Sequence, residues 1–248
     1  MTPEILAALT AAREAKRPAL LATRMPSGEQ MLLPSPAAPP ALAEAAARML
    51  ARDESGTVVL DGVEWFLNTY NPPIRVVVVG AVHIAQALVP MAAELGLAVV
   101  VVDPRRSFAS DERFPNVTVM TDWPDEALDA LRPDSRTAVI TLTHDPKLDD
   151  LALDRALKSD AFYIGSLGSR KNHANRLGRL RKLGHSEEAL ARLRGPVGLD
   201  IGAVTAPEIA LAILAEFTAV RRNARRGETA PKAAVAASTQ AIAATARQ

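Results

Sequence analysis

The sequence predicts an α/β protein with a doubly wound parallel sheet, preceded by a small α+β N-terminal domain. From residue 74 onward, short apolar runs such as residues 76–79 and 98–102 alternate with helical segments. Continuous apolar runs are typical of strands buried on both faces, and strands that alternate with helices form parallel sheets. Before residue 74, strand-like runs are instead paired across turn residues such as Asp61-Gly62. We expect domains at residues 1–73 and 74–222, followed by an Ala/Arg-rich, mobile tail at 223–248.

The small N-terminal domain opens with a helix, for which Thr2 supplies the N-cap and Pro3 the first helical position. Asp61-Gly62 supports the two left-handed positions of a type I′ turn in a hairpin. Asn71-Pro72-Pro73 cannot continue a central strand and is interpreted as a linker. The expected elements are a helix at 2–16, strands at 19–23 and 30–33, a helix at 41–52, and hairpin strands at 57–60 and 63–69.

The second domain is expected to alternate between strands and helices. Gly96 closes its first helix, because glycine readily takes the left-handed conformation that ends helices. The expected strands are residues 76–79, 98–102, 117–120, 137–142, 161–164 and 198–201. The expected helices are residues 83–95, 125–131, 147–158, 170–183 and 206–221. Whether the sheet has five or six strands stays open.

The composition excludes several classes of function. The chain has no cysteine, which rules out disulfides, thiolate metal sites and a cysteine nucleophile. The formal net charge of +1 argues against a dedicated nucleic-acid-binding protein, which normally carries a basic excess on one face. No apolar run reaches the roughly 18 residues that a membrane span needs, and the N-terminus lacks the pattern of a signal peptide. A cytoplasmic protein is expected.

The first candidate site follows the strand at 76–79. Gly80 permits a tight turn into a helix whose N-terminal amides favour a phosphate, and Asp103 ends the next strand, where an acid can bind a ribose hydroxyl. This arrangement predicts a Rossmann-like sheet. Val82 stands where a second glycine normally lets a pyrophosphate approach the backbone. The alternative is that Gly80 only allows close helix–sheet packing and that Asp103 only caps a loop.

The second candidate site is Thr143-His144-Asp145-Pro146, directly after the strand at 137–142. Ligands of open parallel sheets bind at the carboxyl ends of the strands, near the point where the strand order reverses. His83 and His144 would both lie on this edge, although an isolated histidine is more often structural. Asp145 either caps the following helix or joins His144, Asp149 and Asp150 in a metal site, and we assign no metal ligand.

The third candidate site is a Gly-rich turn between the strand at 161–164 and the helix at 170–183. Its turn residues are Gly165, Ser166, Gly168 and Ser169. Arg170 and Lys171 follow at the start of the helix, where cations oppose the helix dipole. That placement costs stability unless an anion lies between the two side chains, so the turn is predicted to bind an anion. The alternative is that both side chains lie along a solvated face.

The fourth candidate site is the loop at residues 198–203, where Asp200 and the glycines could close the same crevice. Thr205-Ala206-Pro207-Glu208 follows as a capping box, in which the Glu208 side chain reaches back to the N-cap backbone. Capping is a complete structural explanation for Glu208, and it is preferred over catalysis.

At these four places the sequence resembles the XdhC/CoxI family of accessory proteins of xanthine dehydrogenase and carbon monoxide dehydrogenase types. The matching segments lie within residues 74–220, and they are residues 80–86, 103–105, 108–115, 143–150, 163–170 and 198–208. The resemblance implies a chaperone that binds the molybdenum cofactor. Such a chaperone helps to load the cofactor into an apo molybdenum hydroxylase after sulfuration by a cysteine desulfurase. The implied ligand is molybdopterin or its cytosine dinucleotide form.

The residues expected to bind this cofactor come from the four candidate sites and their neighbours. They are Gly80, Ala81, His83, Asp103, Arg105, Thr143, His144, Asp145, Gly165, Ser166, Gly168, Ser169, Arg170, Lys171 and Asp200. Many family members carry an N-terminal Gly-Gly-Cys segment, and this chain has no cysteine. Any sulfur must therefore come from the partner desulfurase.

Three functions stay open, of which a binding chaperone rather than an enzyme is the leading one. The second is an NAD(P)-dependent oxidoreductase, with Asp103, or Arg105 and Arg106, at the ribose or its phosphate and with His144 as acid/base. The third is an interaction protein with a vestigial Rossmann domain, whose small N-terminal unit and arginine-rich segment dock an acidic partner. That segment contains Arg221, Arg222, Arg225 and Arg226. A homodimer is compatible with all three.

Overall fold

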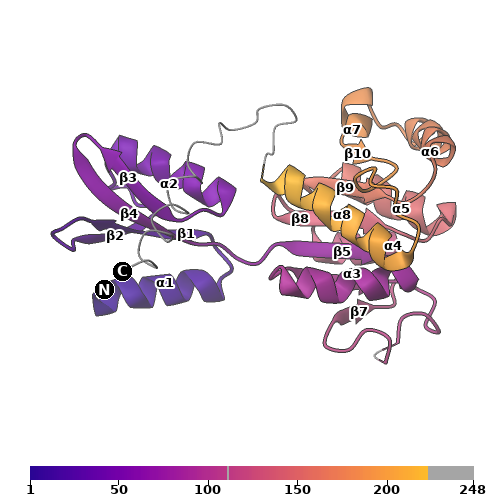
Figure 1. Ribbon diagram of the computed structural model, residues 1–248, viewed down its shortest axis with the longest axis horizontal. Coiled ribbons are helices and arrows are strands. Elements are labelled where there is room, and N and C mark those ends of the chain that lie inside the picture. Colours follow the sequence, from indigo (N-terminus) through magenta and orange to yellow (C-terminus); the bar gives the residue numbers. More distant parts are fainter. Residues whose placement is uncertain (111, 223–248) are drawn as a thin grey trace, which may run out of the picture.

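The computed structural model describes residues 1–110 and 112–222, and the tail predicted at 223–248 lies outside the described residues. Two separate sheets dominate the fold, one antiparallel with four strands and one parallel with six. Figure 1 shows them as two bodies joined by an extended segment that leads into β5 (Arg75–Val79). Within the described ranges, no helix combines the length and the apolar character that crossing a bilayer demands.

One helix covers each face of the N-terminal sheet. The strand order is β2-β1-β4-β3, and its strands are β1 (Ala19–Arg24), β2 (Gln30–Leu33), β3 (Gly56–Leu60) and β4 (Val63–Tyr70). Because side chains alternate along a strand, Leu20 and Ala22 pack against α2 (Pro40–Arg52), whereas Ala19 packs with α1 (Pro3–Glu14). Asp61 and Gly62 both have positive φ, 50° and 75°, as the predicted type I′ turn requires.

The second sheet is parallel throughout and has the order β10-β9-β8-β5-β6-β7. Besides β5, its strands are β6 (Ala98–Val102), β7 (Thr118–Met120), β8 (Thr137–Thr141), β9 (Tyr163–Ser166) and β10 (Leu193–Arg194). The order reverses between β5 and β8, because the chain runs from β5 outward to β7 and then restarts on the other side of β5. This is the doubly wound order of Rossmann folds, so the predicted fold class is confirmed.

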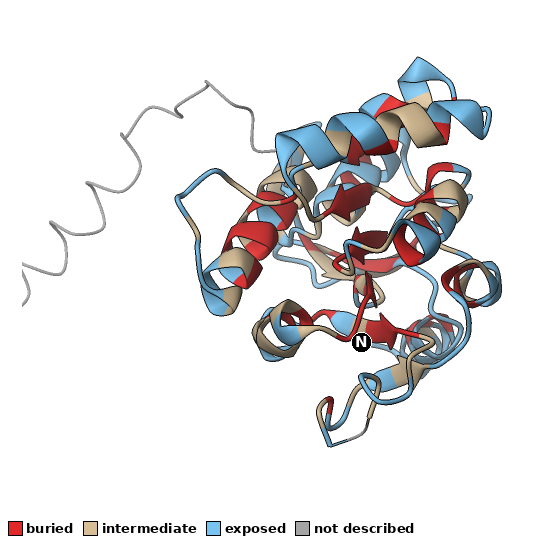
Figure 2. Cartoon of the chain, turned by 90° about the vertical axis from the view of Figure 1, so that its right-hand side faces the viewer, coloured by how far each residue is buried: buried red, intermediate tan, exposed pale blue. Residues whose placement is uncertain are grey.

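Helices cover both faces of the parallel sheet. One face packs against α3 (His83–Glu94) and α8 (Ala206–Arg221), and the other against α4 (Pro124–Leu131), α5 (Pro146–Leu157) and α6 (Arg170–Lys182). The four valines of β5 at residues 76–79 are each 0% exposed, two toward each layer. Figure 2 shows the buried residues gathered along these central strands. Burial on both faces is the physical reason why these strands are continuously apolar in sequence.

The predicted strand at residues 198–201 is wrong. Gly198 has a φ of +100°, and the N–H of Leu199 donates to Ala212 O of α8 at 3.1 Å, so this segment is a loop that precedes α8 and lies against it. The sixth strand is instead β10, which has two residues and pairs with β9. The short helix α7 (Glu187–Ala191) precedes it, and the sequence pattern predicts neither element.

Ionic contacts hold the two bodies together beside the linker at residues 71–73. Asp53 follows the end of α2 in the left-handed conformation, with a φ of 51°. Its carboxylate accepts hydrogen bonds from Asn71, from Arg136 at 3.1 Å and from Arg221 at 3.0 Å. Burial by itself raises the pKa of Asp53, but the bonds from Asn71 and the two arginines outweigh it and lower the pKa below its usual value. Asp53 is therefore an anionic latch between the bodies.

The arginine-rich segment proposed to dock a partner is partly used inside the chain. Arg221 binds Asp53, and Arg222 donates to Arg52 O at 2.8 Å. These two side chains stabilise the junction between the bodies, which corrects their assignment to a docking surface. Arg225 and Arg226 lie outside the described residues.

Candidate functional site

The loops that follow β5, β6, β8 and β9 meet at the carboxyl edge of the parallel sheet, beside the reversal of strand order. This is where ligands of doubly wound sheets bind. A fifth loop, residues 198–203, joins them through a contact of 3.7 Å between Arg170 Nη2 and Asp200 Oδ2. All four predicted sites are thus brought to one edge.

Gly80 sets the distance between the loops after β5 and β8. Its φ is +113°, and a Cβ on this residue would lie 2.7 Å from Thr143 Cγ2 and 3.3 Å from Thr143 N. Only glycine allows this close approach without a shift of the neighbouring backbone. The next residue, Ala81, is fully buried, and the exposed side chain of His83 stands at the first position of α3.

Asp103 is fully buried beneath this turn and accepts four hydrogen bonds. Oδ2 accepts from Ala81 N at 2.8 Å and from Arg105 Nη2 at 2.7 Å, and Oδ1 accepts from Arg105 N at 3.0 Å and Nε at 2.8 Å. Burial by itself raises the pKa of Asp103, but these bonds outweigh it and hold the pKa below its usual value. A ribose hydroxyl would have to displace Arg105 to reach this carboxylate.

Arg113 fixes the same turn, and no motif in the sequence singles it out. Nη1 donates to Ala81 O at 2.9 Å and to Phe108 O at 2.7 Å, and Nη2 donates to Gln86 Oε1 at 2.9 Å. The one signal for it is its place inside the matching segment at residues 108–115. Arg105 stacks over the Phe108 ring, 4.5 Å from its centroid, so two guanidinium groups surround this loop.

The loop after β8 is held by its own side chains. Asp145 caps α5 by accepting from Lys147 N at 2.9 Å, and Thr143 Oγ1 donates to Asp149 Oδ1 at 2.6 Å. His144 is exposed and has a φ of +62°, a left-handed conformation that is strained for a residue with a side chain.

The alternative of a metal site at this loop gains no support. Asp150, which that site would need, is bound by Arg179, whose Nη2 lies 2.9 Å from Asp150 Oδ1. Over residues 1–110 and 112–222, no three histidine, aspartate or glutamate side chains are grouped closely enough to hold a metal ion. The aspartates of this segment instead cap α5 or form ion pairs.

The turn between β9 and α6 contains residues of two kinds, some that pack or cap inside the protein and some whose side chains are exposed. A Cβ at Gly165 would collide with Val197, and Ser166 Oγ lies 2.6 Å from Thr141 Oγ1 inside the sheet, so both residues pack internally. Ser169 caps α6 by accepting from Asn172 N at 3.2 Å. The predicted anion-binding side chains Arg170 and Lys171 are both exposed.

Arg176, one turn further along α6, is a cation that the sequence pattern does not single out. Its side chain is 4% exposed, and its Nη2 donates to Leu167 O at 3.0 Å and to Asp149 Oδ2 at 3.4 Å. Arginine in a strongly basic helix is usually solvated, so the sequence contains no signal for its burial.

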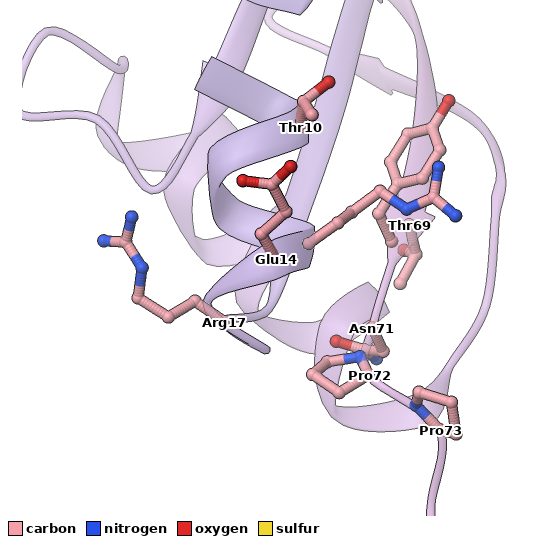
Figure 3. Close-up of a pocket in the computed structure, with 9 residues that line it drawn as sticks. Thr10, Glu14, Arg17, Thr69, Asn71, Pro72 and Pro73 are labelled. Carbon is pink, nitrogen blue, oxygen red and sulfur yellow. The ribbon is translucent and has the colours of Figure 1, made fainter. Parts of the chain in front are cut away.

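A separate cleft lies in the N-terminal body, beside the linker. It has a volume of about 670 Å³ and lies where the end of α1 meets the linker, among Arg13, Arg17, Tyr70 and Pro72 (Figure 3). The linker leads into the amino end of β5, so this cleft is not part of the carboxyl edge. It contains none of the predicted site residues.

The strand order defines a doubly wound α/β protein, a class in which ligands bind at the edge where these loops meet. The family described as the XdhC Rossmann domain matches residues 76–217, which is more than half of the chain. The chain therefore belongs to the XdhC family, and the resemblance found in the sequence is confirmed.

Three relatives illustrate this membership. The chain is 36% identical over 167 residues to an uncharacterized protein, YqeB, of Escherichia coli K12, and 39% identical over 98 residues to the molybdenum cofactor insertion chaperone PaoD of the same organism. It is 30% identical over 159 residues to a probable xanthine dehydrogenase subunit of Bacillus subtilis 168. These matches cover 65%, 40% and 64% of this chain. They cover only 30%, 31% and 46% of the relatives, so the chain spans less than half of each.

A solved structure shares the overall fold. It is described as a xanthine dehydrogenase from Bacillus halodurans, and it superposes with a TM-score of 0.56 over 87% of this chain and 93% of that chain. The two sequences are 19% identical, so this likeness speaks for the fold alone.

Proposed function

We propose that this protein is an accessory factor that binds the molybdenum cofactor and assists its maturation and insertion into a molybdenum hydroxylase. The observation that carries the proposal is the state of the acidic groups at the carboxyl edge. Asp103, Asp145 and Asp149 each accept hydrogen bonds from protein donors. An edge whose carboxylates are already engaged is suited to hold an anionic ligand rather than to exchange protons with a substrate.

The groups around the site fit a ligand that carries a phosphate or pyrophosphate. Arg113, whose hydrogen-bond acceptors are all uncharged, supplies positive charge, and the N-terminus of α6 supplies N–H donors. These groups would hold the phosphate end of molybdopterin or of its cytosine dinucleotide form, and the molybdenum centre supplies the chemistry after transfer to the hydroxylase. The name of the relative PaoD, a molybdenum cofactor insertion chaperone, supports the same ligand.

The partners follow from the same proposal. An apo molybdenum hydroxylase of xanthine dehydrogenase or carbon monoxide dehydrogenase type would receive the cofactor. Because the chain has no cysteine, a cysteine desulfurase would have to supply any sulfur directly to the bound cofactor.

The alternative of an NAD(P)-dependent enzyme requires Asp103 or the arginines after it to bind a ribose or its phosphate. Both carboxylate oxygens of Asp103 are held by Arg105 and Ala81, and Val82 occupies the place of the glycine that admits a pyrophosphate. These contacts favour the accessory function over the dehydrogenase.

Anaerobic gel filtration of the protein with the molybdenum cofactor tests the proposal, with molybdenum measured in the protein peak and NADPH run in parallel. We expect molybdenum to co-elute near stoichiometry and NADPH to elute separately. The loaded fraction should then activate an apo hydroxylase faster than free cofactor does. Retention of NADPH without molybdenum would reject the proposal and favour a reductase.

A further inference from the structure

Arg176 is a buried cation whose charge is only partly matched by the protein. It lies on the inner face of α6, with 4% of its side chain exposed. Its nearest carboxylate is Asp149, at 3.4 Å from Nη2, and Asp149 also accepts a shorter bond of 2.6 Å from Thr143 Oγ1. Burial lowers the pKa of Arg176 in spite of Asp149, and burial raises the pKa of Asp149 in spite of Arg176. Desolvation thus exceeds the attraction between the two groups.

Two nitrogen atoms of this guanidinium have no hydrogen-bond acceptor in the described part of the chain. Among the described residues, neither Nε nor Nη1 of Arg176 has a hydrogen-bond partner, although both are buried. His173, three residues earlier and therefore on the same side of α6, also has a buried Nδ1 atom without a partner in the described part of the chain. An unpaired buried donor costs about 1–3 kcal/mol, and more when it is charged, so such a group usually marks a missing ligand or water.

The guanidinium points at the turn that precedes α6. A Cβ placed on Gly168 would lie 3.7 Å from Arg176 Nη1 and 3.9 Å from Nη2, and its nearest neighbour would be Asn172 Cβ at 3.4 Å. Because residue 168 is glycine, no side chain stands between the turn and the guanidinium, and a phosphate oxygen can approach the N–H groups of Arg176 over the bare Cα of Gly168. The turn itself begins a helix of 13 residues, whose first N–H groups attract an anion.

We propose that the β9–α6 turn and Arg176 together bind one phosphate group, with one of its oxygens seated beside Gly168 and bound by the unpaired N–H groups of Arg176. A guanidinium is suited to this role because its planar donors match the oxygens of a phosphate. The natural ligand rests on the proposed function, in which this group is the phosphate end of the molybdenum cofactor. Arg170, which is exposed and paired with Asp200, lies outside this site.

Isothermal titration of the full chain with sodium pyrophosphate and with inorganic phosphate tests this assignment. Pyrophosphate is expected to bind the wild type, and Arg176→Gln and Arg176→Lys should each weaken it at least tenfold. Arg176→Lys is the sharper variant, because it keeps a positive charge beside Asp149 while removing the Nε and Nη1 donors. The matched control is Arg170→Gln, on the same helix, which should change the affinity less than threefold. Thermal melts identify any variant that fails to fold.

A crystal structure of the wild type with pyrophosphate decides the matter even if both variants unfold. Pyrophosphate within hydrogen-bond distance of Arg176 Nη1 or Nε supports the assignment. Pyrophosphate elsewhere, no binding to the wild type, or a loss of affinity in Arg170→Gln but not in Arg176→Lys overturns it.

The two proposals fail separately. Molybdenum that co-elutes equally with the wild type and with Arg176→Lys would reject the phosphate site and leave the accessory function standing. Pyrophosphate bound through Arg176, together with no molybdenum in the protein peak, would do the reverse.

Discussion

Replacing Asp103 with asparagine should destabilise the protein, because this carboxylate organises the edge at which the loops meet. Its two oxygens accept four hydrogen bonds, three of them from Arg105 and one from Ala81 N. The asparagine side chain would keep one carbonyl oxygen but would present an amide N–H₂ group to donors that now face an acceptor. Losing charged hydrogen bonds and leaving a buried donor unpaired costs about 2–3 kcal/mol once the 36% exposure of the Arg105 side chain is taken into account.

That loss corresponds to a fall in Tm of roughly 4–12 °C for a chain of this size. Circular dichroism melts of the wild type and Asp103→Asn measure it, with the exposed residue Asp122 changed to asparagine as the control. The difference in Tm between the wild type and Asp103→Asn should depend on pH, and it should be larger at neutral pH than in acid. The pKa of Asp103 is lowered by folding, so its contribution is complete above the unfolded value of 3.8 and is lost as the pH falls through the lower folded value.

The gap between wild type and Asp103→Asn should therefore be largest near neutral pH and should shrink below about pH 4. A melting temperature within 1 °C or so of the wild type at pH 7 would contradict this expectation. It would mean that Arg105 and Ala81 N find other partners at little cost, and that the buried carboxylate does not organise the edge.

Three other changes have definite expected outcomes. Gly80→Ala should lower the stability by about 1–3 kcal/mol in urea denaturation, because its Cβ meets Thr143 and its φ is positive. Asp145→Ala removes the cap of α5 and should cost about 1 kcal/mol by the same measurement. Asp53→Asn weakens the latch, so limited proteolysis should cut the linker at residues 71–73 several-fold faster. Pyrophosphate affinity should stay within about twofold in Asp53→Asn, and a large change there would show that the two bodies are coupled.

The fold could be predicted where local patterns and tertiary context agree. The valine run of β5 is apolar at every position because both faces of the strand are covered by helices. Such a continuous apolar run is typical of a central parallel strand, so this element could be predicted. The loop at 198–201 resembles a strand in composition, but the positive φ of Gly198 and its contact with α8 decide otherwise. The two-residue strand β10 is too short to leave any periodicity in the sequence.

The position of the candidate site was predictable, but the roles of its residues were not. Strand–turn–helix patterns place Gly80 and Gly168 on one edge, since ligand loops follow strands in this fold class. The pattern predicts anion binding by Arg170 and Lys171 because both stand at the helix start. The structure leaves these two side chains exposed and buries Arg176, which the pattern does not single out. Whether an arginine is buried depends on what α5 and the turn place against it, and these contacts are distant in sequence.

The latch at Asp53 and the carboxyl edge lie at opposite ends of β5. This strand has five residues, so the two places are separated by roughly 16 Å of rigid, fully paired backbone. The N-terminal body is attached at the amino end, where Arg136, Arg221 and the linker also gather. The loops at the carboxyl edge therefore lie on the side of the sheet away from the N-terminal body (Figure 1), and a ligand can reach them without passing that body.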